Sequence, residues 1–85
     1  MLQVHVIVYS RPGCHLCDEA KAAMLAAGCA EHFVLQEINI DTDPDLYDRY
    51  KHEIPVISIN GVEAFRYRVD PKVFKETITR LSLNP

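Results

Sequence analysis

The spacing of apolar residues changes once in the first third of the chain, and the change predicts a strand followed by a helix. Residues 3–9 are rich in β-branched and aromatic side chains, and their apolar residues fall on both faces of an extended segment. Residues 15–27 then repeat apolar side chains at helical spacing, and Gly28 suits a helix C-cap. We therefore expect a central strand covered on both faces, followed by a helix. The apolar positions of this helix are Leu16, Ala20, Ala23, Met24 and Ala27.

A second strand and two further helices follow from the same pattern. Residues 33–40 carry another β-rich apolar run, which we expect to lie more peripherally in the sheet. Asp43 and Asp70 are each followed by proline, so that an N-cap side chain precedes a residue suited to the first helical position. The first pair predicts a short helix through about Lys51. The second predicts the final helix, whose shared apolar face consists of Phe74, Ile78 and Leu81.

The strongest hairpin pattern lies between these two helices. Residues 55–59 and 62–68 flank Asn60-Gly61, a pair favoured where both central turn residues need a left-handed backbone. The resulting order is β-α-β-α-β-β-α, an α/β arrangement. With a right-handed crossover between the first two strands, it gives a four-stranded mixed sheet with helices on both faces. We find no repeat or linker, and we expect residues 1–85 to form a single domain.

Composition and charge exclude several classes of protein. Hydrophobic residues make up 48% of the chain and the net charge is −3 with no basic run, so the electrostatic footprint of a nucleic-acid binder is missing. No apolar stretch is long enough to span a bilayer. Residues 1–6 lack the basic region of a secretory signal, and three cysteines are an odd number for a disulfide framework. We therefore expect a cytoplasmic protein in a reducing compartment, with neither nucleic acid nor membrane as a partner.

Cys14 and Cys17 are the residues whose spacing carries chemistry. They stand three residues apart where the predicted strand gives way to the predicted helix, after a short turn at residues 10–13. In a first helical turn such side chains are neighbours, about 5–6 Å apart, and within reach of a disulfide. The free amides and the positive dipole end of that turn favour a thiolate over a thiol. The pair therefore predicts thiol redox chemistry.

Four short motifs accompany this element order: residues 9–17 (Tyr-Ser-Arg-Pro-Gly-Cys-His-Leu-Cys), 39–41 (Asn-Ile-Asp), 54–56 (Ile-Pro-Val) and 59–61 (Ile-Asn-Gly). With them the chain resembles the thioredoxin fold in its minimal, glutaredoxin-like form, over nearly its whole length. It looks like the small glutaredoxin-like proteins, which are related to glutaredoxins without being typical of them. A Cys-x-x-Cys pair alone is only moderately specific, whereas the pair followed by an Ile-Pro dipeptide that opens a later hairpin is a specific combination.

The resemblance implies roles for the residues around the cysteine pair. Cys14 would be the exposed nucleophile and Cys17 the buried resolving thiol. Arg11 matches a basic position common in glutaredoxins, where it either stabilises the thiolate or a substrate carboxylate, or is a solvated turn arginine. His15 and Leu16 stand where glutaredoxins usually carry Pro-Tyr, so a tyrosine contact to glutathione is missing.

The resemblance also implies a substrate-binding role for Ile54 and Pro55. The family's proline at this position follows a cis peptide bond and packs beside the cysteine pair, which leaves the backbone of Ile54 free to pair with an extended substrate segment. The alternative is a trans proline that only begins a strand. Cis bonds before proline cost about 0.5–1 kcal/mol, so the cis form is accessible in a tight site.

One departure from the glutaredoxin pattern concerns glutathione. Typical glutaredoxins follow the hairpin with a Gly-Gly-x-Asp stretch that receives the γ-glutamyl end of glutathione. Residues 63–70 contain no glycine pair here, and Asp70 serves better as a helix cap. Arg66 or Arg68 is a candidate for binding a glutathione carboxylate in another way. The alternative is that strand residues 62, 64, 66 and 68 share one face, with the arginines in solvent.

The function that these residues indicate is that of a dithiol–disulfide oxidoreductase or electron carrier, monomeric and without a tightly bound cofactor. Its substrates would be protein disulfides or glutathione mixed disulfides, with glutathione as a candidate co-substrate. Its reductant would be a thioredoxin reductase-type enzyme or glutathione. The rival hypothesis is a metal-binding module that uses the two thiolates for Cu(I), zinc or an iron–sulfur cluster.

Residues outside these motifs have more ordinary interpretations. Cys29 is interpreted as a small apolar residue or bystander thiol, with glutathionylation or an intermolecular disulfide as the alternative. Asp18, Glu19 and Lys21 form a solvated helix face in this interpretation. His5 alternates within an apolar strand and is expected to be a satisfied core or edge histidine.

Overall fold

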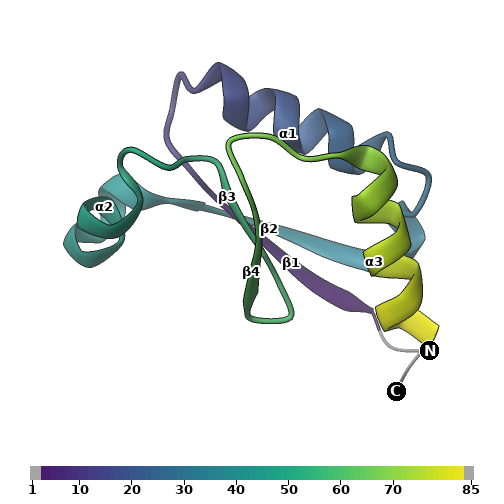
Figure 1. Cartoon of the computed structure of the whole chain (residues 1–85). Coiled ribbons are helices and arrows are strands. Elements are labelled where there is room, and N and C mark those ends of the chain that lie inside the picture. Colours follow the sequence, from purple (N-terminus) through teal and green to yellow (C-terminus); the bar gives the residue numbers. More distant parts are fainter. Residues whose placement is uncertain (1–2, 84–85) are drawn as a thin grey trace.

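Four strands form one mixed sheet in the order β2-β1-β3-β4 (Figure 1). In the computed structural model, which describes residues 3–83, the strands are β1 (Val4–Ser10), β2 (Phe33–Asn39), β3 (Val56–Ile59) and β4 (Val62–Arg66). The central strand β1 pairs in parallel with β2 and antiparallel with β3, and β4 completes the hairpin with β3. The predicted element order and the peripheral position of the second strand are both confirmed.

Within residues 3–83, two helices and two single 3₁₀ turns lie between the strands, and a third helix follows the last strand. The helices are α1 (His15–Leu25), α2 (Pro44–Tyr50) and α3 (Pro71–Leu83), and the turns are η1 (Ala30–His32) and η2 (Ile40–Thr42). Figure 1 shows α1 and α3 beside one another, with α2 at the opposite end of the molecule. Within residues 3–83, no helix combines the length and the apolar composition that crossing a membrane would require.

The core lies between one face of the sheet and the helices α1 and α3. Val4, Val6 and Val8 alternate along β1 and are at most 2% exposed, so they line a single face of the strand. Phe74 of α3 is fully buried against them, and its ring meets Phe33 of β2 edge to face with centroids 5.2 Å apart. Burial on this face fixes the register of the sheet, because a slip of one residue would turn these side chains into water.

The opposite face of β1 is covered only at its C-terminal end. There Tyr9 packs against Tyr50 of α2, with ring centroids 4.8 Å apart. At the other end His5 is exposed and its ring bonds the side chain of Gln36, while Ile7 between them is half-buried. A helix of seven residues spans about 10 Å, whereas a strand of seven spans about 23 Å. The expectation that β1 is covered on both faces is therefore wrong along its N-terminal half.

The two Asp-Pro pairs cap helices as predicted. Asp43 Oδ1 accepts hydrogen bonds from the amides of Asp45 and Leu46, and Asp70 Oδ1 accepts from those of Lys72 and Val73. The first helix ends earlier than predicted, because Leu25 is its last residue and Ala26 is its C-cap. Gly28 is therefore not the cap. With φ of +85° it turns the chain from the end of α1 into the buried Cys29.

The hairpin turn has the predicted conformation. Asn60 and Gly61 have φ values of +50° and +83°, the left-handed pair that a two-residue turn needs between twisted strands. The second strand of the hairpin is shorter than predicted, because β4 ends at Arg66. The residue after it, Tyr67, has φ of +67°, which breaks the strand alternation.

We predict that Asp70→Ala destabilises the protein by about 1 kcal/mol, because two amides at the start of α3 lose their acceptor. Urea unfolding followed by circular dichroism measures the change. Asp70→Asn keeps a side-chain acceptor and should retain most of the stability. Equal losses in the two variants would show that the cap hydrogen bonds are not the source of the effect.

Candidate functional site

The cysteine pair sits at the N-terminus of α1 and is joined by a disulfide. Cys14 is the N-cap residue and is half-buried, whereas Cys17, in the first turn, is only 1% exposed. Their Cα atoms are 5.2 Å apart, within the range that a disulfide bridges. The structure therefore presents one accessible sulfur and one protected sulfur.

The first turn of α1 directs a backbone donor at the accessible sulfur. Cys14 Sγ accepts a hydrogen bond of 3.1 Å from the amide of Cys17. At most helix N-caps, the acceptor of this backbone hydrogen bond is the side-chain oxygen of Ser, Thr or Asp. A negatively charged thiolate accepts such a hydrogen bond more strongly than a thiol does. The same amide, together with the positive end of the helix, would stabilise a thiolate on Cys14 after reduction.

Sheet register brings Pro55 to the end of β1 from which the cysteine loop leaves. Tyr9 pairs with Val56 in the antiparallel β1–β3 ladder, so Pro55 lies one position further along, opposite Ser10. The Ile54–Pro55 peptide bond is cis, the form that the resemblance implies. Pro55 is buried and Ile54 is half-buried. Both residues therefore lie at the sheet end that carries the cysteine pair.

Arg11, three residues before Cys14, is held by two contacts. Its Nε lies 2.8 Å from Asp41 Oδ1, and its guanidinium carbon lies 5.3 Å from the ring centroid of Tyr47 on α2. Asp41 belongs to the Asn-Ile-Asp motif, whose part in the site was not evident from the sequence. Arg11 therefore links the cysteine loop to η2 and α2, and a simple solvated arginine does not describe it.

A polar cluster that the sequence did not indicate lies beside the cysteine pair. Glu37 Oε2 accepts hydrogen bonds of 2.8 Å from the buried Ser10 hydroxyl and from the Lys21 ammonium. Lys21 follows Cys17 by one helical turn, and its Nζ also lies 3.5 Å from Asp18. The cluster forms part of the wall of a polar hollow of about 330 Å³ beneath the cysteine loop. Lys21 is thus a paired residue, and the solvated face expected here is wrong for it.

The charges of this cluster stabilise one another. The hydrogen bond from Lys21, and then that from Ser10, holds the pKa of Glu37 below its ordinary value of 4.5. The hydrogen bond to Glu37 likewise raises the pKa of Lys21 above 10.5. Both groups are therefore charged at neutral pH, and the Lys21 member lies one helical turn after Cys17.

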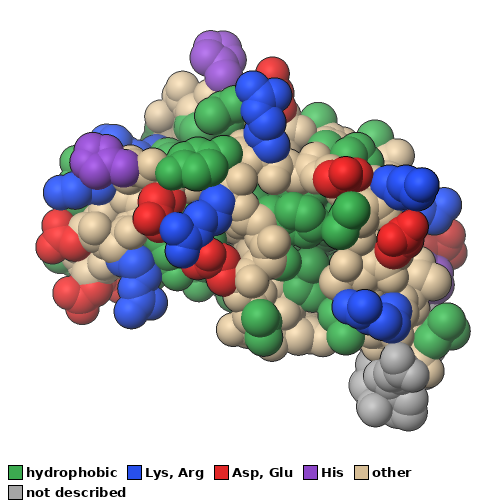
Figure 2. Space-filling view, viewed as in Figure 1, with side chains coloured by type: hydrophobic (Ala, Val, Ile, Leu, Met, Phe, Trp, Pro, Cys, Tyr) green, Lys and Arg blue, Asp and Glu red, His purple; other side chains and the backbone are tan. Residues whose placement is uncertain are grey.

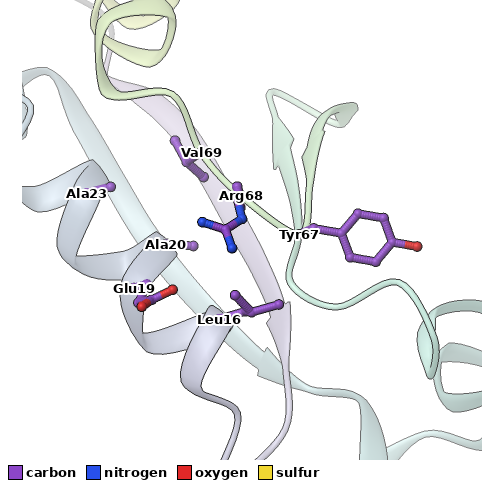
Figure 3. A pocket seen from close by; sticks show the side chains of 7 residues that line it. All are labelled: Leu16, Glu19, Ala20, Ala23, Tyr67, Arg68 and Val69. Atoms are coloured by element: carbon purple, nitrogen blue, oxygen red, sulfur yellow. The ribbon is translucent and has the colours of Figure 1, made fainter.

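The two arginines after the hairpin have different surroundings. Arg66 bonds Glu63 and lies 3.1 Å from a carboxylate oxygen of Glu53. Arg68 instead points into a pocket of about 200 Å³ between α1 and the segment 67–69 (Figure 3). The expectation that residues 62, 64, 66 and 68 share one face is therefore wrong. A register shift opposite Ile57 and Ser58 interrupts the alternation within β4, and the left-handed Tyr67 turns the chain after it. The pocket is lined by Leu16, Glu19, Ala20, Ala23, Tyr67, Arg68 and Val69.

Tyr67 ties this segment to the loop that carries the cis peptide bond. Its amide donates to the carbonyl of Pro55 over 2.8 Å, and its hydroxyl donates to the carbonyl of His52 over 3.2 Å. The amide of Arg68 reaches back to the carbonyl of Arg66 over 2.7 Å, which closes a tight three-residue turn. A non-glycine residue with positive φ is uncommon, and such residues cluster at functional sites.

The remaining candidate residues separate into surface and core. His15 is exposed at the start of α1, and Leu16 is half-buried at the edge of the pocket. Cys29 is 1% exposed within the core cluster, where burial raises the pKa of its thiol.

On the face of the molecule shown in Figure 2, acidic and basic side chains are interspersed. Among residues 3–83, no three His, Cys, Asp or Glu side chains are grouped so that they could hold a metal ion.

Comparison with known proteins gives a consistent family relationship. The model of the "Glutaredoxin-like domain (DUF836)" family matches residues 5–80. A glutaredoxin-like protein of Dictyostelium discoideum is 30% identical over 73 residues, which cover 79% of this chain and 68% of that protein.

Solved structures agree with this relationship. The solution structure of protein Ne2328 from Nitrosomonas europaea superposes with a TM-score of 0.77 at 30% identity, covering 91% of this chain and 93% of that one. The crystal structure of protein XcR50 from X. campestris gives 0.69 at 25% identity, with 94% and 99% covered. A thioredoxin from Halobacterium salinarum, at 15% identity, gives 0.64 with 95% and 76% covered, and this likeness concerns the fold alone.

We predict that Glu37→Gln lowers stability at pH 7 by about 0.2–1 kcal/mol, the range of partly exposed ion pairs. Because folding lowers the pKa of Glu37, its contribution is present above pH 4.5 and is lost as pH falls through the folded value. The difference between the variant and the natural protein should therefore shrink towards pH 3. Urea unfolding at both pH values measures it, with the exposed Glu76→Gln as control. A difference that is independent of pH would contradict the charge assignment.

Proposed function

This chain belongs to the glutaredoxin-like domain family, and on that basis we propose that it is a dithiol–disulfide oxidoreductase that works through Cys14 and Cys17. The observation that carries the proposal is the disulfide at the N-terminus of α1, with one accessible and one buried sulfur. A disulfide between the two cysteines is the oxidised form that such an enzyme reaches each time it reduces a substrate.

In the reduced protein the Cys14 thiolate attacks one sulfur of a substrate disulfide. A bond forms between Cys14 and that sulfur, the substrate S–S bond breaks, and the other half leaves as a thiolate that takes up a proton. Cys17 then loses its proton and attacks Cys14, so that the bound half leaves as the reduced thiol. Two electrons pass from the cysteine pair to the substrate, and the Cys14–Cys17 disulfide of the structure is the product.

Two features of the site support Cys14 as the attacking sulfur and Cys17 as the sulfur that releases the product. The amide of Cys17 faces Cys14 Sγ at the positive end of α1, and helix N-termini lower cysteine pKa values from about 8.5 to between 3.5 and 7.5. Cys17 is buried and adjacent in space, so it meets Cys14 in an intramolecular step that no outside thiol can match in effective concentration.

Substrate recognition is proposed for the residues around the pair. Arg11 precedes the cysteines, and His15 and Leu16 lie between them. The backbone of Ile54 before the cis Pro55 is the proposed pairing site for an extended substrate segment. The partners proposed are disulfide-containing proteins and glutathione mixed disulfides. A thioredoxin reductase-type enzyme or glutathione would supply the electrons. We further propose that the protein acts as a monomer in the cytoplasm without a tightly bound cofactor.

We predict that the Cys14–Cys17 pair undergoes a reversible two-electron reduction between about −200 and −270 mV, in the range of glutaredoxin- and thioredoxin-like reductants. Equilibration in glutathione and dithiothreitol buffers, with mass spectrometry to count thiols, measures the potential. A protein that forms no disulfide between these residues across that range would refute the proposal. Stoichiometric Cu(I) bound at the two thiolates without disulfide exchange would favour the metal-binding alternative.

We also predict that Cys14→Ser abolishes disulfide reduction, whereas Cys17→Ser accumulates mixed disulfides on Cys14. The physical reason is that the first variant lacks the attacking sulfur and the second lacks the sulfur that releases the product. Turnover of a model protein disulfide and mass spectrometry of the trapped species measure the two effects. Cys29→Ala changes the remaining cysteine and should keep full turnover. Full activity in Cys14→Ser would contradict the mechanism.

A further inference from the structure

The loop between α2 and β3 is held by two consecutive residues at the end of the hairpin. Arg66, the last residue of β4, lies 3.1 Å from a carboxylate oxygen of Glu53. Tyr67 follows it, and donates its amide to the carbonyl of Pro55 over 2.8 Å and its hydroxyl to the carbonyl of His52 over 3.2 Å. The loop is therefore fastened at three of its residues, and two of the three contacts come from Tyr67.

Ile54 lies between these fastened residues with its own backbone unpaired. It is half-buried, and neither its amide nor its carbonyl forms a hydrogen bond with any of residues 3–83. The β1–β3 ladder ends at the pair Tyr9–Val56, so it does not include Ile54. The residue before a proline is restricted to an extended backbone, and unpaired groups on extended backbone are those to which an added strand pairs. Ile54 therefore continues the line of β3 with a donor and an acceptor that the fold leaves unused.

The backbone conformation of Tyr67 accompanies these contacts. Its φ of +67° is left-handed, which is uncommon for a residue with a Cβ atom. Figure 3 shows its ring directed away from the pocket that Arg68 and Val69 line, and 47% of the residue stays exposed. Such a conformation persists only where the surrounding contacts maintain it. The bonds to the loop thus maintain Tyr67, and Tyr67 in turn holds the loop.

A loop that is held before binding favours a polypeptide over a small disulfide. A polypeptide carries amides and carbonyls on both sides of its reacting cysteine, and these can pair with the backbone of Ile54. A small disulfide such as hydroxyethyl disulfide has no such groups. If the loop were mobile, part of the free energy of pairing would be lost in ordering it, and this loss would affect only the ligand that pairs with it.

We propose that Tyr67 is a positioning residue that holds the loop 52–55, so that Ile54 pairs with a polypeptide bound at the site. Disulfides within extended polypeptide segments are in consequence preferred over small disulfides. The pairing site at Ile54 belongs to the proposed function, and the role of Tyr67 rests on it. The exchange itself is unchanged: Cys14 attacks a sulfur of the bound polypeptide, the substrate S–S bond breaks, and the other sulfur leaves as a thiolate that takes up a proton. Cys17 then loses its proton and releases the polypeptide as a thiol.

The first test compares two disulfides that differ in backbone. The interchain disulfides of insulin lie within polypeptide, whereas hydroxyethyl disulfide carries no peptide group. We expect Tyr67→Phe, which loses one neutral hydrogen bond, to raise KM for insulin about three- to tenfold and to leave kcat unchanged. Tyr67→Gly adopts positive φ without strain but lacks the hydroxyl, and should raise KM for insulin at least as much. In both variants the reduction of hydroxyethyl disulfide and the potential of the cysteine pair should stay as in the natural protein.

Tyr50→Phe is the matched control for Tyr67→Phe. It removes the same hydroxyl from a tyrosine whose ring packs on Tyr9 and whose hydroxyl bonds none of residues 3–83, so it should leave KM for insulin unchanged. An unchanged KM for insulin in Tyr67→Phe would overturn the proposal. Equal losses with insulin and hydroxyethyl disulfide, or an equal effect of Tyr50→Phe, would also overturn it, because a general structural role would then suffice.

The second test does not need turnover. In Cys17→Ser, the Cys14 sulfur attacks a cysteine peptide activated as its thiopyridyl disulfide and releases thiopyridone, while the buried Cys29 stays unlabelled. Mercaptoethanol attached in the same way supplies a partner without a backbone. We expect hydrogen exchange at the Ile54 amide to slow about tenfold in the peptide conjugate alone, and Tyr67→Phe to diminish this slowing.

The two tests separate the role of Tyr67 from the proposed function. If neither insulin nor hydroxyethyl disulfide is reduced but the peptide slows exchange at Ile54 in a Tyr67-dependent way, the proposed function fails and the role of Tyr67 stands. If both disulfides are reduced but the peptide leaves exchange at Ile54 unchanged, the proposed function stands and the role of Tyr67 is overturned.

Discussion

The candidate site depends on β1 being the central strand, paired on both edges and buried on one face. Its C-terminal end leads directly into the loop that carries Cys14, and its pairing with β3 brings Pro55 opposite that end. Its parallel pairing with β2 brings Glu37 within reach of Ser10. The burial of Val4, Val6 and Val8 fixes all of these registers at once, because each of them fails if the strand slips by one residue. The packing of the core thus determines how the residues of the candidate site are placed at the end of the sheet.

Local sequence signals predicted the helix starts and the hairpin turn well. The Asp-Pro pairs, the Asn-Gly turn and the helical start at the cysteine pair each depend on interactions between residues close in the chain, so a few residues suffice to identify them. The family resemblance added the cis bond before Pro55, which no local pattern encodes, and the roles that we propose for Cys14 and Cys17. The fold class followed from the order of these elements, since a crossover between parallel strands has one hand.

The parts that the sequence did not predict depend on distant contacts. The bonds from Ser10 and Lys21 to Glu37 require a parallel register and a helix orientation that no spacing reveals, and the sequence placed Ser10 in a turn. Tyr67 is a second case, since an aromatic residue after a strand predicts more strand and not a left-handed turn. Its conformation follows from bonds to Pro55 and His52, both more than ten residues away. This turn separates Arg66 from Arg68 and gives the two arginines different partners.

The short helix α2 has a consequence for the dynamics of the molecule. None of its residues is buried, and it meets the sheet chiefly through the ring of Tyr50 on Tyr9. Elements with so little buried surface open locally at a lower free energy than the core, without global unfolding. Arg11 bonds η2 and stacks on α2, so such an opening also releases the loop before Cys14. In amide hydrogen exchange, α2 and the cysteine loop would then form one cooperative unit of low protection, which exchanges while the sheet and the helices α1 and α3 stay folded.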